Sequence, residues 1–181
     1  MNLQTNRLII RNLREGDLAD FLKYRSDAEV CRFQGYEPFT ETQAEKYIEN
    51  VKDSKFGEAG KWFQLGIELK GEDKLIGDIG LKPEAFEVRI VEFGVSFSTA
   101  FQGKGYAKEA LTHTFNYLFA EKNVHRVVGI VDVENLSCIH LLENMNFRRE
   151  AHFLQSFCDN GVWRDEYLYA MLKNDWVKIL R

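Results

Sequence analysis

Two strand patterns flank a long helical pattern between residues 89 and 131. Residues 89–97 end in strict alternation of apolar and polar side chains, which is typical of a strand. Apolar residues recur at helical spacing over residues 105–122, and residues 127–131 are apolar on both faces, as in a strand covered on both sides. These elements form a βαβ unit, in which the two strands run parallel with a right-handed crossover. We therefore expect a sheet with a parallel pair at its centre.

Further strands and helices flank this unit. Helices are predicted to begin at Asp17 and Thr40 and to span residues 136–145, and Asn160-Gly161 is a strong hairpin signal. Further strands are predicted at residues 8–11, 62–69, 74–81, 148–157 and 162–171. The predicted order is βααβββαβαββ, with about four helices. We expect an α/β (α+β) fold with a mixed, mostly antiparallel, seven-stranded sheet around the parallel βαβ element.

Length and composition exclude several classes of protein. A chain of 181 residues fits one domain, residues 1–181. No run approaches the roughly 18 apolar residues of a membrane helix, and the first residues lack the apolar segment of a signal peptide, so we expect a cytoplasmic protein without a membrane partner. A net charge of −4 disfavours direct nucleic-acid binding through a positive surface. Three cysteines, far apart in sequence, disfavour a disulfide framework or a zinc site.

A glycine-rich turn precedes the central helix. Its residues are Gln102, Gly103, Lys104, Gly105, Tyr106 and Ala107. Helix N-termini carry unpaired amides and partial positive charge, so glycines there let a pyrophosphate approach several amides. The spacing matches neither the P-loop nor the dinucleotide fingerprint. A tight turn without a ligand is the alternative interpretation of the glycines alone.

Gln102-x-x-Gly105-x-Ala107 at the start of a helix resembles the acetyl-CoA pyrophosphate motif of the GNAT superfamily of N-acetyltransferases. Four segments in the same order make the chain similar to the RimJ/RimL branch of ribosomal-protein acetyltransferases: Thr5-Asn6-Arg7-Leu8, residues 76–81, Asn135-Leu136-Ser137 leading to residues 145–147, and residues 161–165. The resemblance implies a GNAT-like fold, acetyl-CoA as donor, no metal, an amine acceptor and a homodimer in many members. The acceptor is either a peptide or protein N-terminus or a small amine.

The strand before the turn carries the candidate base. Along residues 91–97 the odd positions are apolar, which places Glu92, Gly94 and Ser96 on the opposite face. An alkyl ammonium has a pKa of roughly 10, so a carboxylate must accept its proton. The resemblance implies that Glu92 is this base; a solvated strand glutamate is the alternative. It also implies that backbone groups near Val95 and Phe97 pair with the pantetheine arm, where this strand splays from its parallel neighbour.

Asn135 and Ser137 lie between the second strand of the βαβ unit and the next helix. Both residue types cap helices well, which is one interpretation. The resemblance implies instead that Asn135 hydrogen-bonds the pantetheine amide and that Ser137 faces the thioester sulfur. Leu142 occupies the position where many GNAT enzymes have a proton-donating tyrosine, so Ser137 becomes the candidate donor to the thiolate.

Several features leave the acceptor open. The acidic residues Glu37, Glu41, Glu45 and Glu49 are hypothesised to attract a cationic amine. The histidines show no metal-type spacing, and Cys138 lacks a paired base. Aromatic residues either line an acceptor pocket or belong to the core: Phe33, Tyr36, Phe39, Trp62 and Phe63. The competing functions are a non-catalytic CoA-binding or interaction protein and an acyltransferase that uses another acyl-CoA.

Overall fold

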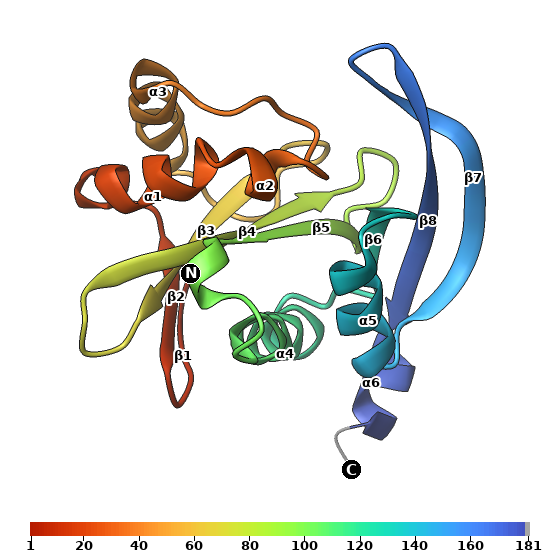
Figure 1. The fold of residues 1–181 in the computed structure, drawn as a ribbon. Coiled ribbons are helices and arrows are strands. Elements are labelled where there is room, and N and C mark those ends of the chain that lie inside the picture. The colour runs from red at the N-terminus through yellow and green to blue at the C-terminus, as the bar shows by residue number, and fades with distance from the viewer. Residues whose placement is uncertain (180–181) are drawn as a thin grey trace.

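A mixed eight-stranded sheet with helices on both faces forms the molecule in a computed structural model that describes residues 1–179 (Figure 1). The strand order is β1-β2-β3-β4-β5-β6-β8-β7, and only the central pair β5 and β6 is parallel. Helices α1, α2 and α3 lie on one face, and α4 and α5 lie on the other (Figure 1). The mixed, mostly antiparallel sheet with a central parallel βαβ element is confirmed.

The described residues hold one strand and two α-helices more than expected. The strands are β1 Asn2–Gln4, β2 Leu8–Asn12, β3 Phe63–Leu69, β4 Lys74–Pro83, β5 Ile90–Phe97, β6 Arg126–Asp132, β7 Arg148–Asp159 and β8 Val162–Leu172. The α-helices are α1 Leu18–Arg25, α2 Ala28–Cys31, α3 Glu41–Val51, α4 Tyr106–Glu121, α5 Leu136–Asn144 and α6 Lys173–Ile179. The extra elements β1, α2 and α6 have seven residues or fewer, too short for a periodic pattern to reveal them.

Two apolar cores lie on opposite faces of the sheet. The larger core packs α4, α5 and α6 against the sheet; Phe115 of α4 contacts Phe93 of β5 at a ring distance of 4.9 Å. The smaller core packs α1 and α3 onto the other face, with Phe21 and Ile48 fully buried beside Leu75 of β4. The polar face of β5, with Glu92 and Ser96, looks the same way, toward the side of the sheet on which α1, α2 and α3 lie (Figure 1).

The parallel strands β5 and β6 separate soon after they meet. They pair only at Ile90–Arg126, Val91–Val127 and Glu92–Val128, although each strand continues for at least four more residues. The expectation that residues 127–131 are covered on both faces is wrong at Ile130, whose side chain is 44% exposed. Because β5 turns away after Glu92, this part of β6 lacks a neighbouring strand on that side.

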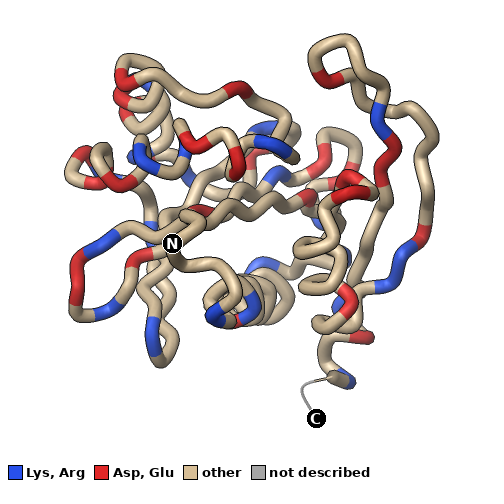
Figure 2. Tube along the Cα trace, viewed as in Figure 1, with Lys and Arg blue, Asp and Glu red and all other residues tan. Residues whose placement is uncertain are grey.

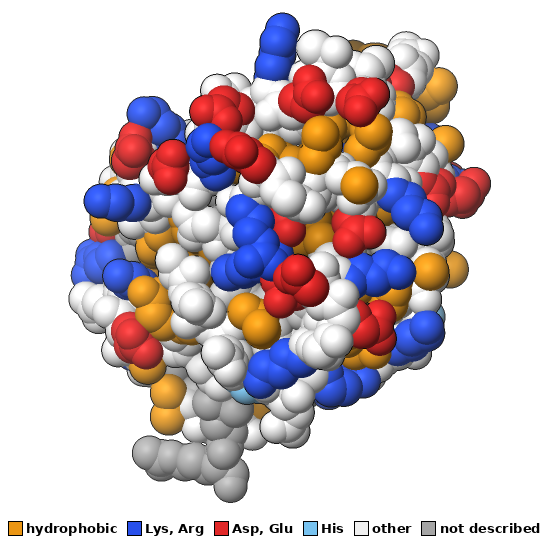
Figure 3. Space-filling view, turned by 90° about the vertical axis from the view of Figure 1, so that its left-hand side faces the viewer, with side chains coloured by type: hydrophobic (Ala, Val, Ile, Leu, Met, Phe, Trp, Pro, Cys, Tyr) orange, Lys and Arg blue, Asp and Glu red, His pale blue; other side chains and the backbone are white. Residues whose placement is uncertain are grey.

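Charged pairs cover the side of the molecule formed by β1, β2, α1 and α3. Arg11 contacts both Asp17 and Glu68 at 2.7 Å, and Arg14 contacts Glu68 at 2.8 Å. Basic and acidic side chains are interspersed over this face (Figure 3). Arg11 of β2 therefore holds this strand to β3 through Glu68. Within residues 1–179, no helix is long and apolar enough to cross a membrane.

Candidate active site

The glycine-rich loop lies exposed between the end of β5 and the start of α4. Gly103 and Gly105 adopt φ values of +71° and +79°, which strain any residue with a side chain. Gln102 donates from Nε2 to the carbonyl oxygen of Phe97 at 3.0 Å, which ties the loop to β5. Gly105 is the N-cap of α4 and offers no side chain to cap the first amides. An exposed helix N-terminus of this kind fits a pyrophosphate.

Arg7 holds this loop from outside. Its Nε lies 2.6 Å from Glu109 Oε2, its Nη1 donates to the Lys104 carbonyl oxygen at 3.0 Å, and its guanidinium lies 4.3 Å from the Tyr106 ring centroid. Partial burial opposes ionisation of Glu109, but hydrogen bonds from Thr5 and Arg7 outweigh it and lower the pKa of this carboxyl. This role of Arg7 has only one signal in the sequence, the Thr5-Asn6-Arg7-Leu8 segment, which does not show what Arg7 contacts.

Glu92 is half-buried on β5, and its carboxylate is paired with a charged neighbour. It lies opposite Lys82 in the β4–β5 register, and its carboxylate forms an ion pair with the Lys82 ammonium. The ammonium also lies 5.1 Å from the ring centroid of Trp62, whose side chain is 46% exposed. Lys82 therefore balances the charge of the candidate base from the neighbouring strand.

Val95 and Phe97 lie on the part of β5 beyond its last contact with β6. Their side chains pack with the larger core, and Phe97 is buried. The edge of β5 that faces β6 has no strand partner past Glu92. Backbone groups along this edge are thus free of sheet hydrogen bonds to β6, as the resemblance requires of a pantetheine site.

Asn135 and Ser137 lie at the start of α5, close in the chain to the open end of β6. Asn135 caps the helix, because its Oδ1 accepts from the Cys138 amide at 3.1 Å. Ser137 is exposed in the first turn, whereas Leu142 is fully buried in the core. Burial raises the pKa of Cys138 to about 11, so its thiol stays protonated near neutral pH.

A buried ion pair that was not predicted from the sequence lies under the acceptor side. Arg25 of α1 donates from Nη2 to Asp78 Oδ1 at 2.6 Å, and the hydroxyl of Tyr24 donates to Oδ2 at 2.5 Å. The guanidinium lies 4.4 Å from the ring centroid of Tyr36, whose hydroxyl is 3.3 Å from Ser96 Oγ of β5. Burial raises the pKa of Tyr36, so this hydroxyl is protonated at neutral pH. The signal in the sequence is an aspartate inside the apolar strand 76–81.

A groove of about 530 Å³ lies between the segment after α2 and the tip of the β7–β8 hairpin. Tyr36 and Glu37 line one side, and Phe157 and Asp159 line the other. Asn160 Nδ2 donates to Glu37 Oε1 at 3.1 Å across the groove. The two sides are more than 100 residues apart in the chain, so no local pattern predicts the groove.

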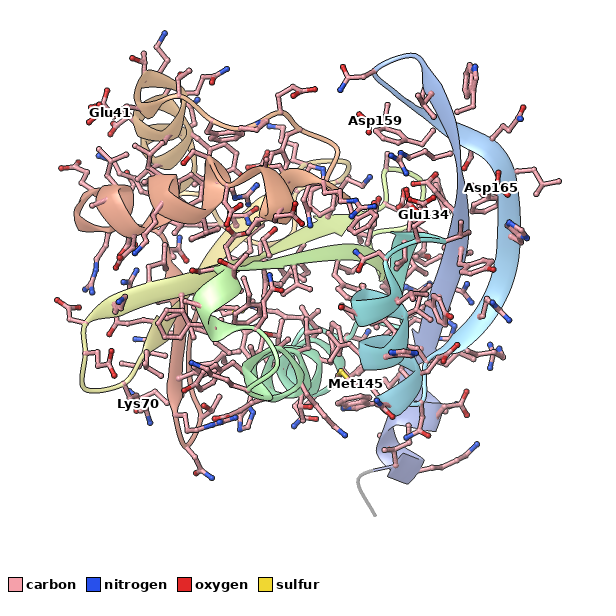
Figure 4. The ribbon with its side chains drawn as sticks, in the orientation of Figure 1. Glu41, Lys70, Glu134, Met145, Asp159 and Asp165 are labelled. Atoms are coloured by element: carbon pink, nitrogen blue, oxygen red, sulfur yellow. The ribbon has the colours of Figure 1, made fainter. Side chains whose placement is uncertain are left out.

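Acidic side chains gather near the tip of this hairpin. Arg164 of β8 lies within 3.5 Å of Asp132, Glu134 and Asp159. Figure 4 shows Glu134 and Asp159 on the side of the hairpin that faces α2, and Figure 2 shows further acidic positions along α3. Of the four glutamates expected near the acceptor, only Glu37 lines the groove, and Glu41 lies on α3 away from the hairpin (Figure 4).

The predicted site aromatics divide between surface and core. Phe63 is buried, and Phe39 packs against the smaller core. Tyr36 lines the groove, Trp62 is half-exposed beside Lys82, and the ring of Phe33 lies 4.9 Å from the Arg32 guanidinium. Among residues 1–179, no three His, Cys, Asp or Glu side chains are grouped to hold a metal ion.

Comparisons with known proteins agree with this geometry. The profile of the acetyltransferase (GNAT) domain matches residues 7–148. The uncharacterized N-acetyltransferase YnaD of Bacillus subtilis is 32% identical over 97% of this chain and 99% of its own length. A spermidine N(1)-acetyltransferase of Vibrio cholerae is 28% identical over 95% of this chain and 96% of its own length. A GNAT-family acetyltransferase structure from Bacillus anthracis superposes with a TM-score of 0.87 at 29% identity, covering 96% of this chain and 99% of that one.

The expected likeness to ribosomal-protein acetyltransferases is weaker. The ribosomal protein uS5 alanine N-acetyltransferase of Escherichia coli is 26% identical over 97% of this chain and 93% of its own length. These two relatives are N-acetyltransferases by name, one named for the small amine spermidine and one for an alanine of a ribosomal protein. The chain therefore belongs to the acetyltransferase (GNAT) family and is an acetyl-CoA-dependent N-acetyltransferase.

Proposed function

We propose that residues 1–181 act as one domain that acetylates a small cationic amine, with Glu92 as the base and Ser137 as the donor to the sulfur. The observation that carries this proposal is the position of Glu92, half-buried at the point where β5 and β6 separate. Bound acetyl-CoA supplies an acetyl thioester there. The loop Gln102–Gly105, with Tyr106 and Ala107 of α4, binds its pyrophosphate.

The residues of the chain divide the proton transfers between them. An alkyl ammonium with a pKa of roughly 10 must lose a proton before it can attack, and Glu92 accepts that proton directly or through water. Lys82 compensates the negative charge of Glu92 before the transfer. As the C–N bond forms and the C–S bond breaks, Ser137 donates a hydrogen bond to the departing thiolate, which takes up the second proton of the amine nitrogen. Amides on the free edge of β5 near Val95 and Phe97 hold the pantetheine arm and the developing oxyanion.

Asn135 is proposed to bind the cofactor through its side-chain NH₂ group, which the fold leaves free. Its Oδ1 already accepts from Cys138, so only the NH₂ group remains to donate a hydrogen bond. A pantetheine carbonyl is the partner that such a donor fits. The capping role and the proposed cofactor role are therefore compatible.

The charge of the groove supports a cationic acceptor. Glu37 and Asp159 line it, and Glu134 lies beside them with Arg32 and Arg164 as counter-ions. Together with Asp132, four carboxylates lie near two guanidinium groups. The excess of negative charge attracts a cation. The spermidine acetyltransferase among the relatives points the same way. Exposed Leu154 and Trp163 on the β7–β8 hairpin also fit the contact of a homodimer.

The acceptor proposal predicts a preference that mass spectrometry measures. Wild-type protein with acetyl-CoA is expected to acetylate spermidine at least about tenfold faster than peptides that begin with Ser or Ala and carry no charged side chains. Glu37→Gln is expected to raise the KM for spermidine and to leave the KM for acetyl-CoA unchanged, because Glu37 lies at the groove. Glu41→Gln is the matched control, since Glu41 lies on α3 outside the groove. Faster acetylation of the peptides would assign the chain to protein N-termini instead.

The loop proposal predicts a change in melting temperature. Acetyl-CoA at about 100 times its Kd stabilises the folded state by roughly 2.7 kcal/mol, which raises the Tm of a domain this size by about 5–10 °C. Gly105→Glu is expected to abolish the shift, because the new carboxylate strains a φ of +79° and repels the pyrophosphate. Gly71→Glu strains a φ of +82° in the β3–β4 turn and should keep the shift. Equal loss in both variants would reduce the loop to a structural turn.

A further inference from the structure

Two glycines lie opposite each other in the middle of the sheet, on the side where α1, α2 and α3 lie. Gly80 of β4 pairs with Gly94 of β5 in register. On this face the polar pair Asp78 and Ser96 precedes them, and Lys82 and Glu92 follow. The sheet therefore has a floor of two residues without side chains, the Gly80/Gly94 floor, directly beside the candidate base.

The two glycines of the floor have different surroundings. A Cβ on Gly80 would lie 3.0 Å from the Trp62 ring and 3.2 Å from Gln64 Oε1, so packing explains that glycine. A Cβ on Gly94 would meet no atom within 4 Å, and its φ lies outside the left-handed region. Neither backbone conformation nor packing requires glycine there, and a strand interior disfavours it.

The side chains around the open space above Gly94 indicate what kind of molecule enters it. Glu92 lies two residues before Gly94 and Ser96 two residues after it, each about 7 Å from Gly94 along the strand. Tyr36 reaches Ser96 from the segment after α2, and Trp62 covers the neighbouring Gly80. Phe93 faces the other way and packs on α4, the helix that follows the glycine-rich loop. The space above Gly94 thus opens toward the groove side and not toward α4.

We propose that Gly94 determines specificity for the acceptor: the missing side chain leaves the space through which the amine reaches the Glu92 carboxylate, with Trp62 and Tyr36 as its walls. This inference rests on the proposed function of Glu92 as base. The acceptor class that fits is a primary amine on an unbranched carbon. The space is only one residue position wide, because the side chains of Glu92 and Ser96 occupy the positions on either side of Gly94. Water, which is smaller, still reaches the thioester when Ala or Val occupies position 94.

The test is the series Gly94→Ala and Gly94→Val, with spermidine as the amine and acetyl-CoA hydrolysis as the second reaction. Gly94→Val is expected to lower kcat/KM for spermidine at least about 100-fold, because a displacement of about 1 Å at a reacting centre costs this much. Gly94→Ala should fall between valine and wild type. Both variants should keep the wild-type Kd for acetyl-CoA, its rate of hydrolysis and at least the wild-type Tm, since either residue suits a strand better than glycine.

The outcomes separate this inference from the function on which it rests. Wild type that binds acetyl-CoA but acetylates no amine would remove the acceptor proposal and the role of Gly94 together. Active wild type with an equally active Gly94→Val would overturn the role of Gly94 alone. A raised Kd for acetyl-CoA in Gly94→Val would assign the space to the cofactor, and a lowered Tm would explain the glycine by packing.

Discussion

Replacing Glu92 by glutamine is expected to lower kcat for amine acetylation by about 100- to 10,000-fold, the contribution of a positioned general base. The amide keeps the size of the side chain and its Oε1 still accepts a hydrogen bond from Lys82. The Kd for acetyl-CoA and the Tm should therefore stay near wild type. Steady-state kinetics with spermidine, together with calorimetric titration of acetyl-CoA, measure both quantities on the same preparation.

The ion pair with Lys82 calls for a matched variant. Lys82→Met removes the counter-ion and leaves the carboxylate, so its loss in kcat should be much smaller than that of Glu92→Gln. The rate of Glu92→Gln should also rise with pH up to roughly 10, because a larger fraction of the amine is then already deprotonated. Full activity of Glu92→Gln at pH 7 would show that another group or bulk water takes the proton.

The backbone features of the site follow from local sequence signals. Gly103 and Gly105 adopt positive φ as a strand-to-helix turn demands, and Asn146 takes a φ of +60° after α5, a region that asparagine tolerates. The Asn160-Gly161 hairpin also forms as predicted, with φ values of +49° and +84°. These features depend on a few consecutive residues, which is why one sequence suffices to predict them.

The charge pairing of the site does not follow from the sequence alone. Lys82 meets Glu92, and Arg25 meets Asp78, only because of the register between strands and the docking of α1. The pairing of β5 with β6 ends at Glu92 and Val128. The residue types along the two strands do not predict that end point. Arg7 shows the same limit, since its partner Glu109 lies 102 residues away. Alternation identifies the face of Glu92 but not what that face contacts.

Removing the Asp78 carboxylate has the largest expected effect on stability. Arg25 and Asp78 are 4% and 1% exposed, and the carboxylate also accepts from Tyr24 and from Gln64. Asp78→Ala leaves a buried guanidinium without its counter-ion, which typically costs about 3–5 kcal/mol. For a domain of this size the Tm should fall by roughly 6–20 °C. Glu58→Ala, which breaks an exposed pair with Lys61, should cost less than about 1 kcal/mol.

A double variant distinguishes the ion pair from mere packing. Arg25→Met combined with Asp78→Leu removes both charges, so its loss should be smaller than the sum of the single losses by about 0.5–3 kcal/mol. Additive losses in urea unfolding would mean that the two side chains act independently. The aromatic contact of Arg25 with Tyr36 extends the effect to the site, because Tyr36 meets Ser96 beside Gly94. At temperatures where the Asp78→Ala variant remains folded, its KM for spermidine should therefore rise while its KM for acetyl-CoA does not.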